Sequence, residues 1–324
     1  MVGGKHRIAL AILGVLALLS VAPLLAWTYQ LGSFADWFRY VTLPAAGILI
    51  VAAVIGRPSR LPNLRVALTS GLIGGLMGTI GYDLFRIPFA ALGMRLFSPI
   101  ESYGVLLMDA STSSGWTDLA GWAYHFSNGI ALGIFYACVA LDRHWGWAIL
   151  WAMILETATV VTPFADAYAL RGRWGVITIA YAAHIPYGLG LGYVVSRGTS
   201  LSAALKEKFR NPVAATLVLL TLFLLLWHRP FLEDPNDAAG RAIAPGPSAQ
   251  IVDGRFAPEW VRVTRGCAIF FNADKVTYRV VTSLSVTDIR GDSTEVICFD
   301  GFGVERVPLS IEPYSGGFVI VDRE

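Results

Sequence analysis

The pattern of apolar and polar positions divides the chain into two unlike parts. Up to residue 228, long apolar runs alternate with short polar loops, whereas beyond it short β-type runs alternate with turn dipeptides. A helix needs about 20 apolar residues to cross a hydrocarbon core of about 30 Å. Seven runs approach this length: 8–26, 41–56, 66–85, 119–141, 145–164, 174–196 and 213–227. The pattern predicts a transmembrane bundle of about seven helices in residues 1–228.

Two stretches of this part have more than one interpretation. The run 8–26 resembles the apolar core of a signal peptide, because Ser20-Val21-Ala22 is similar to a cleavage site, but Pro23 directly after it favours a retained first helix. The stretch 87–115 is apolar but is interrupted by charged residues and a proline. A full span there would invert every later helix, so we expect an external amphipathic or re-entrant segment.

The basic residues between the apolar runs are divided unevenly. The loops on the side of the N-terminus hold ten Lys and Arg residues, and the loops on the other side hold five. Cytoplasmic loops carry an excess of Lys and Arg. The sequence therefore predicts a multi-pass protein of a bacterial inner membrane, with a cytoplasmic N-terminus and, after an odd number of spans, a periplasmic C-terminal part.

The C-terminal part is predicted to hold a linker and a small β domain. Residues 229–258 are rich in proline and glycine, which is typical of an extended linker. In residues 259–324, alternation such as that of Val276, Tyr278 and Val280 with polar neighbours indicates strands, and Asp300-Gly301 indicates a turn. We expect an antiparallel sandwich of cupredoxin-like or immunoglobulin-like type.

Cys267 and Cys298 are the cysteines of this β domain. A core of this size is small and the predicted compartment is oxidising, so a disulfide between them is favoured. It would stabilise the domain by about 3–4 kcal/mol in the chain-entropy model. The alternative is two buried free thiols.

The segment from Val261 to Asp274 resembles the opening hairpin of cupredoxin domains, with Val261-Arg262-Val263 followed by Gly266-Cys267-Ala268-Ile269-Phe270-Phe271-Asn272-Ala273-Asp274. The resemblance implies a cupredoxin-like fold. A blue-copper site needs two histidines and a cysteine, usually with an axial methionine. Since no histidine or methionine lies beyond residue 228, we expect no type 1 copper.

Composition supports a membrane location. Hydrophobic residues make up 55% of the 324 residues and charged residues only 15%, with a net charge of +2. A soluble domain usually carries about 25% charged residues. These values exclude a disordered chain, a basic nucleic-acid-binding protein and an ordinary cytosolic enzyme. The lipid bilayer is the first partner that they predict.

Glycine spacing predicts which helices pack closely. Two runs share the pattern His-x3-Gly-x3-Gly, formed by His125, Gly129 and Gly133 in one and by His184, Gly188 and Gly192 in the other. Gly71 and Gly75 repeat the four-residue spacing in the third run, as do Gly74 and Gly78. Residues four apart share one helix face, and small residues there allow close helix approach.

Four ionisable residues within the predicted helices form a candidate binding site. His125, Glu156 and His184 fall at similar depth in the outer half of the bilayer, and Asp83 is shallower. Such residues usually face the bundle interior and mark function. They are also of the types that bind a metal, haem or pigment. The alternatives are a purely structural role, including an Asp83–Arg86 ion pair at i, i+3, and a proton or solute path.

No motif for catalysis is evident. HExxH, CxxC, GxSxG and a phosphate-binding GK[ST] are absent, and Tyr82 and Tyr124 are interpreted as packing residues. The spacing Tyr82-Asp83-x-x-Arg86 with His184-x-x-Tyr187-Gly188 resembles bacterial inner-membrane proteins, a resemblance that implies no activity.

The function that best fits these observations is that of a non-catalytic accessory subunit of a larger membrane complex, respiratory or photosynthetic, which docks through its β domain. Other subunits of that complex would be its partners, and nucleic acid would not. A membrane protein that binds a ligand through Asp83, His125, Glu156 and His184 is the alternative. A solute or proton transporter is the third.

Overall fold

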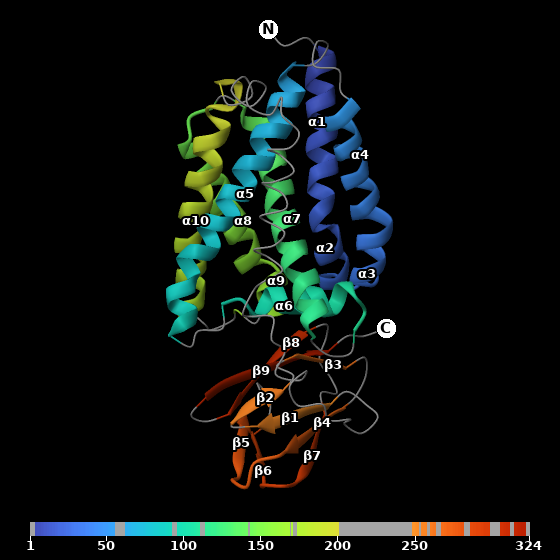
Figure 1. The fold of residues 1–324 in the computed structure, drawn as a ribbon, viewed down its shortest axis with the longest axis vertical. Coiled ribbons are helices and arrows are strands. Elements are labelled where there is room, and N and C mark those ends of the chain that lie inside the picture. Colours follow the sequence, from blue (N-terminus) through green and yellow to red (C-terminus); the bar gives the residue numbers. More distant parts are fainter. Residues whose placement is uncertain are drawn as a thin grey trace, which may run out of the picture.

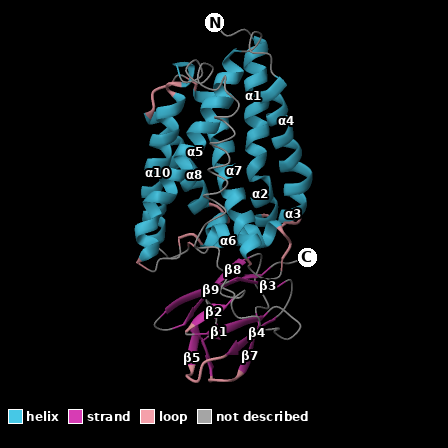
Figure 2. Ribbon diagram, viewed as in Figure 1, coloured by secondary structure: helices cyan, strands magenta, loops and turns pink. Residues whose placement is uncertain are grey.

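The computed structural model describes residues 4–55, 62–92, 96–110, 114–141, 143–168, 170, 174–200, 248–252, 254–257, 260–263, 267–281, 286–298, 305–311 and 314–321. These residues form a mainly helical bundle with a small C-terminal β region at one end (Figures 1 and 2). The predicted seventh span, 213–227, and most of the predicted linker lie outside the described residues.

The helices follow the apolar runs of the sequence. Their bounds are α1 Gly4–Leu18, α2 Ala22–Thr28, α3 Phe34–Trp37, α4 Leu43–Ile55, α5 Pro62–Ala91, α6 Ser98–Leu107, α7 Gly115–Ala140, α8 Gly146–Val161, α9 Phe164–Ala167 and α10 Trp174–Val195. A 3₁₀ turn, Leu19–Val21, joins α1 to α2, and a π-helical turn, Phe38–Thr42, joins α3 to α4. Among the described residues, three stretches are long and apolar enough to cross a membrane: Arg7–Thr28, Phe34–Ala52 and Asn63–Ala91. Helix α8 is apolar but shorter.

The sequence predicts an external amphipathic or re-entrant segment at 87–115, and the described residues there differ from a segment that lies on the outside. Helix α5 continues to Ala91, and α6 is a separate short helix at the end of the bundle that adjoins the β region (Figure 1). Ile100, Ser102, Val105 and Leu106 of α6 are each at most 2% exposed. Helix α6 is therefore packed inside the protein rather than lying on its surface, because α7 covers it on one side and α6 also contacts strand β3, Trp260–Val263.

Glycines bring α5 into backbone contact with α7. A Cβ atom at Gly75 would lie 2.7 Å from both Gly129 O and Ile130 Cα, and one at Gly71 would lie 2.5 Å from Ile134 Cα. Gly133 faces Gly75 and Gly71 from the other helix. Separations this short leave no room for a side chain, so the spacing between these helices depends on glycine.

The second glycine stripe of α5 faces α10. A Cβ atom at Gly78 would lie 2.8 Å from Tyr187 O, and one at Gly74 would lie 3.2 Å from Leu191 O. Gly188 of α10 faces away from α5, because a Cβ atom there would lie 2.6 Å from Ile149 Cα of α8, and Gly192 also meets α8. Helix α5 is thus held between α7 and α10, and α10 in turn packs on α8.

The β region consists of two sheets. The remaining strands are β1 Ser248–Val252, β2 Arg255–Ala257, β4 Cys267–Asn272, β5 Tyr278–Val281, β6 Val286–Ile289, β7 Thr294–Cys298, β8 Glu305–Ile311 and β9 Tyr314–Val321. One sheet has the order β2-β1-β4-β7 and the other β3-β9-β8-β5-β6. The pairs β1–β4 and β3–β9 are parallel. The prediction of a purely antiparallel β region is therefore wrong.

The two sheets share one hydrophobic core. Ile251 and Phe270 of the first sheet and Val280 and Ile289 of the second are completely buried and lie in the same cluster. Strands β1 and β2 belong to this region although the sequence assigned their residues to the linker, because prolines around them masked the alternation that buries Ala249 and Ile251. Cys267 and Cys298 face each other across β4 and β7 and form a disulfide.

Candidate functional site

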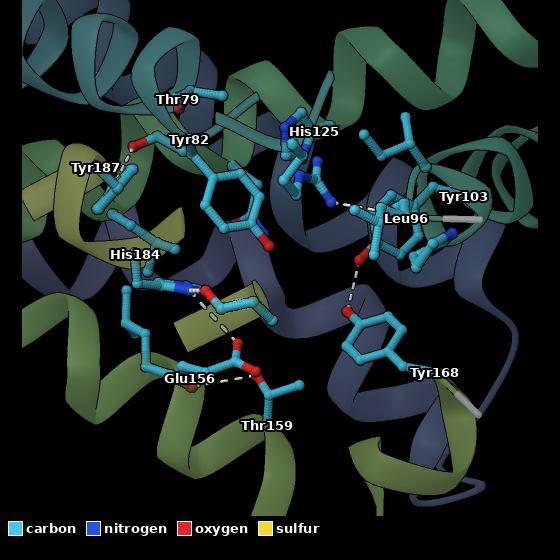
Figure 3. Close-up of a pocket in the computed structure, with 18 of the residues that line it drawn as sticks. Thr79, Tyr82, Leu96, Tyr103, His125, Glu156, Thr159, Tyr168, His184 and Tyr187 are labelled. Carbon is cyan, nitrogen blue, oxygen red and sulfur yellow. Dashed lines mark hydrogen bonds and ion pairs between the residues drawn. The ribbon is translucent and has the colours of Figure 1, made fainter. Parts of the chain in front are cut away.

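A cavity of about 190 Å³ lies within the bundle. Residues of α5, α6, α7, α8 and α10 line it, together with Leu96, Tyr168 and Leu170 from the connecting segments. Three of the four ionisable residues predicted from the sequence are among the lining residues, namely His125, Glu156 and His184. Figure 3 shows that the polar side chains reach this cavity from several helices.

Asp83, the fourth predicted residue, is the centre of a buried ion pair next to the cavity. The Nη2 atom of Arg86 donates to Asp83 Oδ1 over 2.7 Å, and Nε2 of His125 lies 3.1 Å from Asp83 Oδ2. The Arg86 guanidinium also donates through Nη1 to Leu96 O and lies over the rings of Tyr82 and Phe97, with its Cζ atom 4.2 and 4.5 Å from their centroids. The i, i+3 ion pair predicted from the sequence is present, and it balances the positive charge of Arg86.

Glu156 is buried with a much poorer set of partners. Only 3% of the residue is exposed, and its Oε1 atom accepts no hydrogen bond from any residue that the structure describes. Its other oxygen, Oε2, lies 3.5 Å from Nδ1 of His184. That nitrogen already donates to Ala180 O over 2.8 Å, because a carbonyl oxygen can only accept. The carboxylate of Glu156 therefore lacks a well-placed donor.

Tyr82 lies between the two pairs. Its ring packs edge-on to His184 with centroids 4.8 Å apart, and the centroid of His125 lies 6.3 Å away. The four predicted residues thus flank one tyrosine, Asp83 and His125 on one side and Glu156 and His184 on the other. The sequence treated Tyr82 as a packing residue. The sequence feature that could have placed Tyr82 in the site is its position four residues before Arg86, on the same helix face.

Two further tyrosines connect the cavity to the end of the bundle near the β region. The hydroxyl groups of Tyr103, on α6, and Tyr168, after α9, lie 2.5 Å apart, and both residues line the cavity (Figure 3). Tyr187 donates to Gly129 O and joins α10 to α7. Tyr124, by contrast, is 1% exposed and donates to Ser20 O, so it serves packing as predicted.

The structure does not favour a metal centre at these residues. Within the part of the chain that it describes, no three His, Cys, Asp or Glu side chains lie close enough together to hold a metal ion. The residues form two separate pairs, Asp83 with His125 and Glu156 with His184, and the ring of Tyr82 packs near both histidines. The cavity is also below the range of about 300–1,000 Å³ that is typical of sites for drug-sized ligands, which argues against a haem or pigment macrocycle.

Comparison of the chain with models of protein families, with curated proteins and with solved structures found no match. A functional assignment therefore depends on the geometry of the site itself.

Proposed function

We propose that the chain is a seven-span protein of a bacterial inner membrane, with a cytoplasmic N-terminus and the β region as a periplasmic sandwich. Two features support this orientation. Helix α1 begins at the end of the bundle that is far from the β region (Figure 1). Arg7, Arg65, Arg143 and Arg197 all belong to helix ends or loops at that same far end. Clustered basic residues favour the cytoplasmic side.

Reporter fusions test this orientation. Alkaline phosphatase fused to the C-terminus should be active, since it folds only after export, whereas the same reporter inserted at His144, between α7 and α8, should be inactive. A green fluorescent protein fused at these positions should give the opposite pattern. Fluorescence at the C-terminus would contradict the proposal.

We further propose that the protein binds a small polar molecule in the cavity between its helices. The observation that supports this function is Glu156, a carboxylate that is 3% exposed, lines the cavity and has one oxygen without any described donor. An ionised carboxylate in a low-dielectric interior costs several kcal/mol unless a partner compensates it. In a membrane-spanning bundle such a residue marks a functional site. A bound molecule with a donor group would provide the missing partner.

Filling the cavity should abolish this binding. Ala180 lines the cavity, so Ala180→Phe would place a ring within it, whereas Ala158→Phe is a matched control because Ala158 is exposed on α8. Native mass spectrometry of the protein released gently from its own membranes should show the wild-type chain and Ala158→Phe with a retained small molecule, and Ala180→Phe without it. Three identical spectra, or a wild-type chain that retains nothing, would contradict the proposal.

The accessory-subunit hypothesis is a second candidate, and the surface of the β region supports it. Val252, Val276, Val286 and Val296 are 37–61% exposed on this region. Docking on another subunit would cover these side chains. The same spectra test this candidate, because additional subunit masses on the wild-type chain would favour it and an unaccompanied chain would count against it.

A further inference from the structure

We infer that the molecule bound in this cavity is a small amine in its cationic form, with its ammonium group next to Glu156 and its apolar part against the aliphatic lining. The inference rests on the proposed binding function and specifies the ligand class for that site.

The first argument is the balance of charge around the cavity. Among the described residues that line it, Arg86 is the permanent cation and Glu156 is the one carboxylic acid. Asp83, next to the cavity, neutralises Arg86 at 2.7 Å. His184 donates through Nδ1 to Ala180 O, and Nε2 of His125 lies 3.1 Å from Asp83 Oδ2, so both rings have partners other than the Oε1 atom of Glu156. Among the described lining residues, Glu156 is therefore the acid whose nearest described ion partner, His184 Nδ1, lies as far as 3.5 Å away, and a cation is the ligand that would balance its charged form.

The second argument is the supply of acceptors near Glu156. Thr159 lies one turn further along α8, lines the cavity and has already donated its hydroxyl hydrogen to Leu155 O, so its oxygen offers only lone pairs. Figure 3 shows Thr159 beside Glu156 and the hydroxyl group of Tyr82 directed toward the middle of the site. A primary ammonium group carries three donors. The carboxylate, Thr159 and Tyr82 are acceptors that can receive them.

The third argument concerns the remaining lining. Leu132, Leu155 and Val176 provide an apolar wall, and Tyr103 and Tyr168 provide aromatic rings. Such a wall suits the carbon skeleton of an amine, and aromatic rings also attract organic cations. At Arg86 an anion would meet Nη1 and Nη2 already engaged by Leu96 O and Asp83, and both faces of the guanidinium covered by Tyr82 and Phe97. Its Nε has no partner among the described residues, so binding of the carboxylic acids is the direct test of this point.

Calorimetric titration of the full chain in lipid nanodiscs tests the inference. Butylamine, benzylamine and phenethylamine would each be compared with the alcohol and the carboxylic acid of the same carbon skeleton. We expect at least one amine to bind at neutral pH at least tenfold more tightly than its alcohol, and the acids to bind more weakly still. A charge-assisted hydrogen bond is strong enough for a difference of this size.

Glu156→Gln provides the second comparison, because it keeps the shape of the side chain and removes the charge. We expect this variant to lose the preference for the amine over the alcohol, and the control Glu295→Gln, on the exposed strand β7, to retain it. Equal affinity for amines and alcohols in the wild-type chain, tighter binding of the acids, or an unchanged preference in Glu156→Gln would overturn the inference. The wild-type comparison stands even if Glu156→Gln does not fold.

The outcomes for the ligand class and for the binding function are separable. If native mass spectra show a retained neutral or anionic molecule that Ala180→Phe excludes, the amine is wrong and the binding function holds. If the wild-type chain retains nothing and no titrated molecule binds, both are wrong. Retention of an amine that is absent from Glu156→Gln would support both.

Discussion

Asp83→Leu is expected to lower the free energy of unfolding by about 3–5 kcal/mol, the range for removing one partner of a buried ion pair. Arg86 is 5% exposed, and its guanidinium would keep its charge without the carboxylate that now lies 2.7 Å away. His125 would lose its acceptor at the same time. Chemical or thermal unfolding of the purified chain in detergent, followed by tryptophan fluorescence, measures the change.

Two controls isolate the buried charge as the cause. Asp83→Leu combined with Arg86→Leu should recover most of the lost stability, because replacing both ions with apolar groups removes the unpaired charge. Asp288→Leu breaks the Arg279–Asp288 pair of the β region, whose side chains are 58% and 55% exposed, and should cost at most about 1 kcal/mol. If the double variant were no more stable than Asp83→Leu alone, the interpretation of Asp83 as the counter-ion of Arg86 would be wrong.

Gly75→Val is expected to destabilise the bundle by about 3 kcal/mol, at the upper end of the range for inserting side-chain atoms into a tightly packed interior. The first added carbon would already lie 2.7 Å from backbone atoms of α7. Backbone cannot turn aside as a flexible side chain can, so α5 and α7 would have to separate. Their separation would also displace Tyr82 from His125 and so disturb the cavity.

Gly47→Val is the matched control for this change. Gly47 lies on α4, and a Cβ atom there would meet nothing within 4 Å. The substitution should leave the unfolding transition within about 0.5 kcal/mol of the wild type, as is usual for surface changes. Equal destabilisation by the two variants would indicate an effect of glycine removal on the helix itself, and not of packing between α5 and α7.

Several features of the fold follow directly from local pattern. The runs 8–26 and 66–85 lie inside the helical stretches Arg7–Thr28 and Asn63–Ala91, because an apolar segment of this length has to satisfy its backbone as a helix in a membrane. Their ends were harder to predict. The third run was predicted to end near Phe85, yet α5 continues to Ala91, and Asp83 pairs with Arg86 within this helix.

The fold of the β region follows less directly from local pattern than the helices do. Alternation in the sequence indicates strands, but it does not say which strands are neighbours, and pairing such as that of β3 with β9 joins residues almost 60 positions apart in the chain, Trp260 and Phe318. The prolines near β1 and β2 made this segment appear to be a linker, because the composition of a segment does not show which strand pairs with it. The predicted cysteine pair is adjacent because the register of β4 and β7 places Cys267 opposite Cys298.

The sequence by itself determined which ionisable residues lie within the apolar runs, and it predicted their depth, since helical rise converts residue number into position along a membrane-spanning helix. It also determined the glycine faces on which helices can approach, since spacing of four repeats one side of a helix. Tertiary structure alone decided that Asp83 pairs with His125 while Glu156 lies beside His184, with Tyr82 between the pairs. The reason is that each partner stands on a different helix, and the order and rotation of helices in a bundle depend on packing among all of them. That packing leaves the carboxylate of Glu156 facing a cavity with no described donor for Oε1.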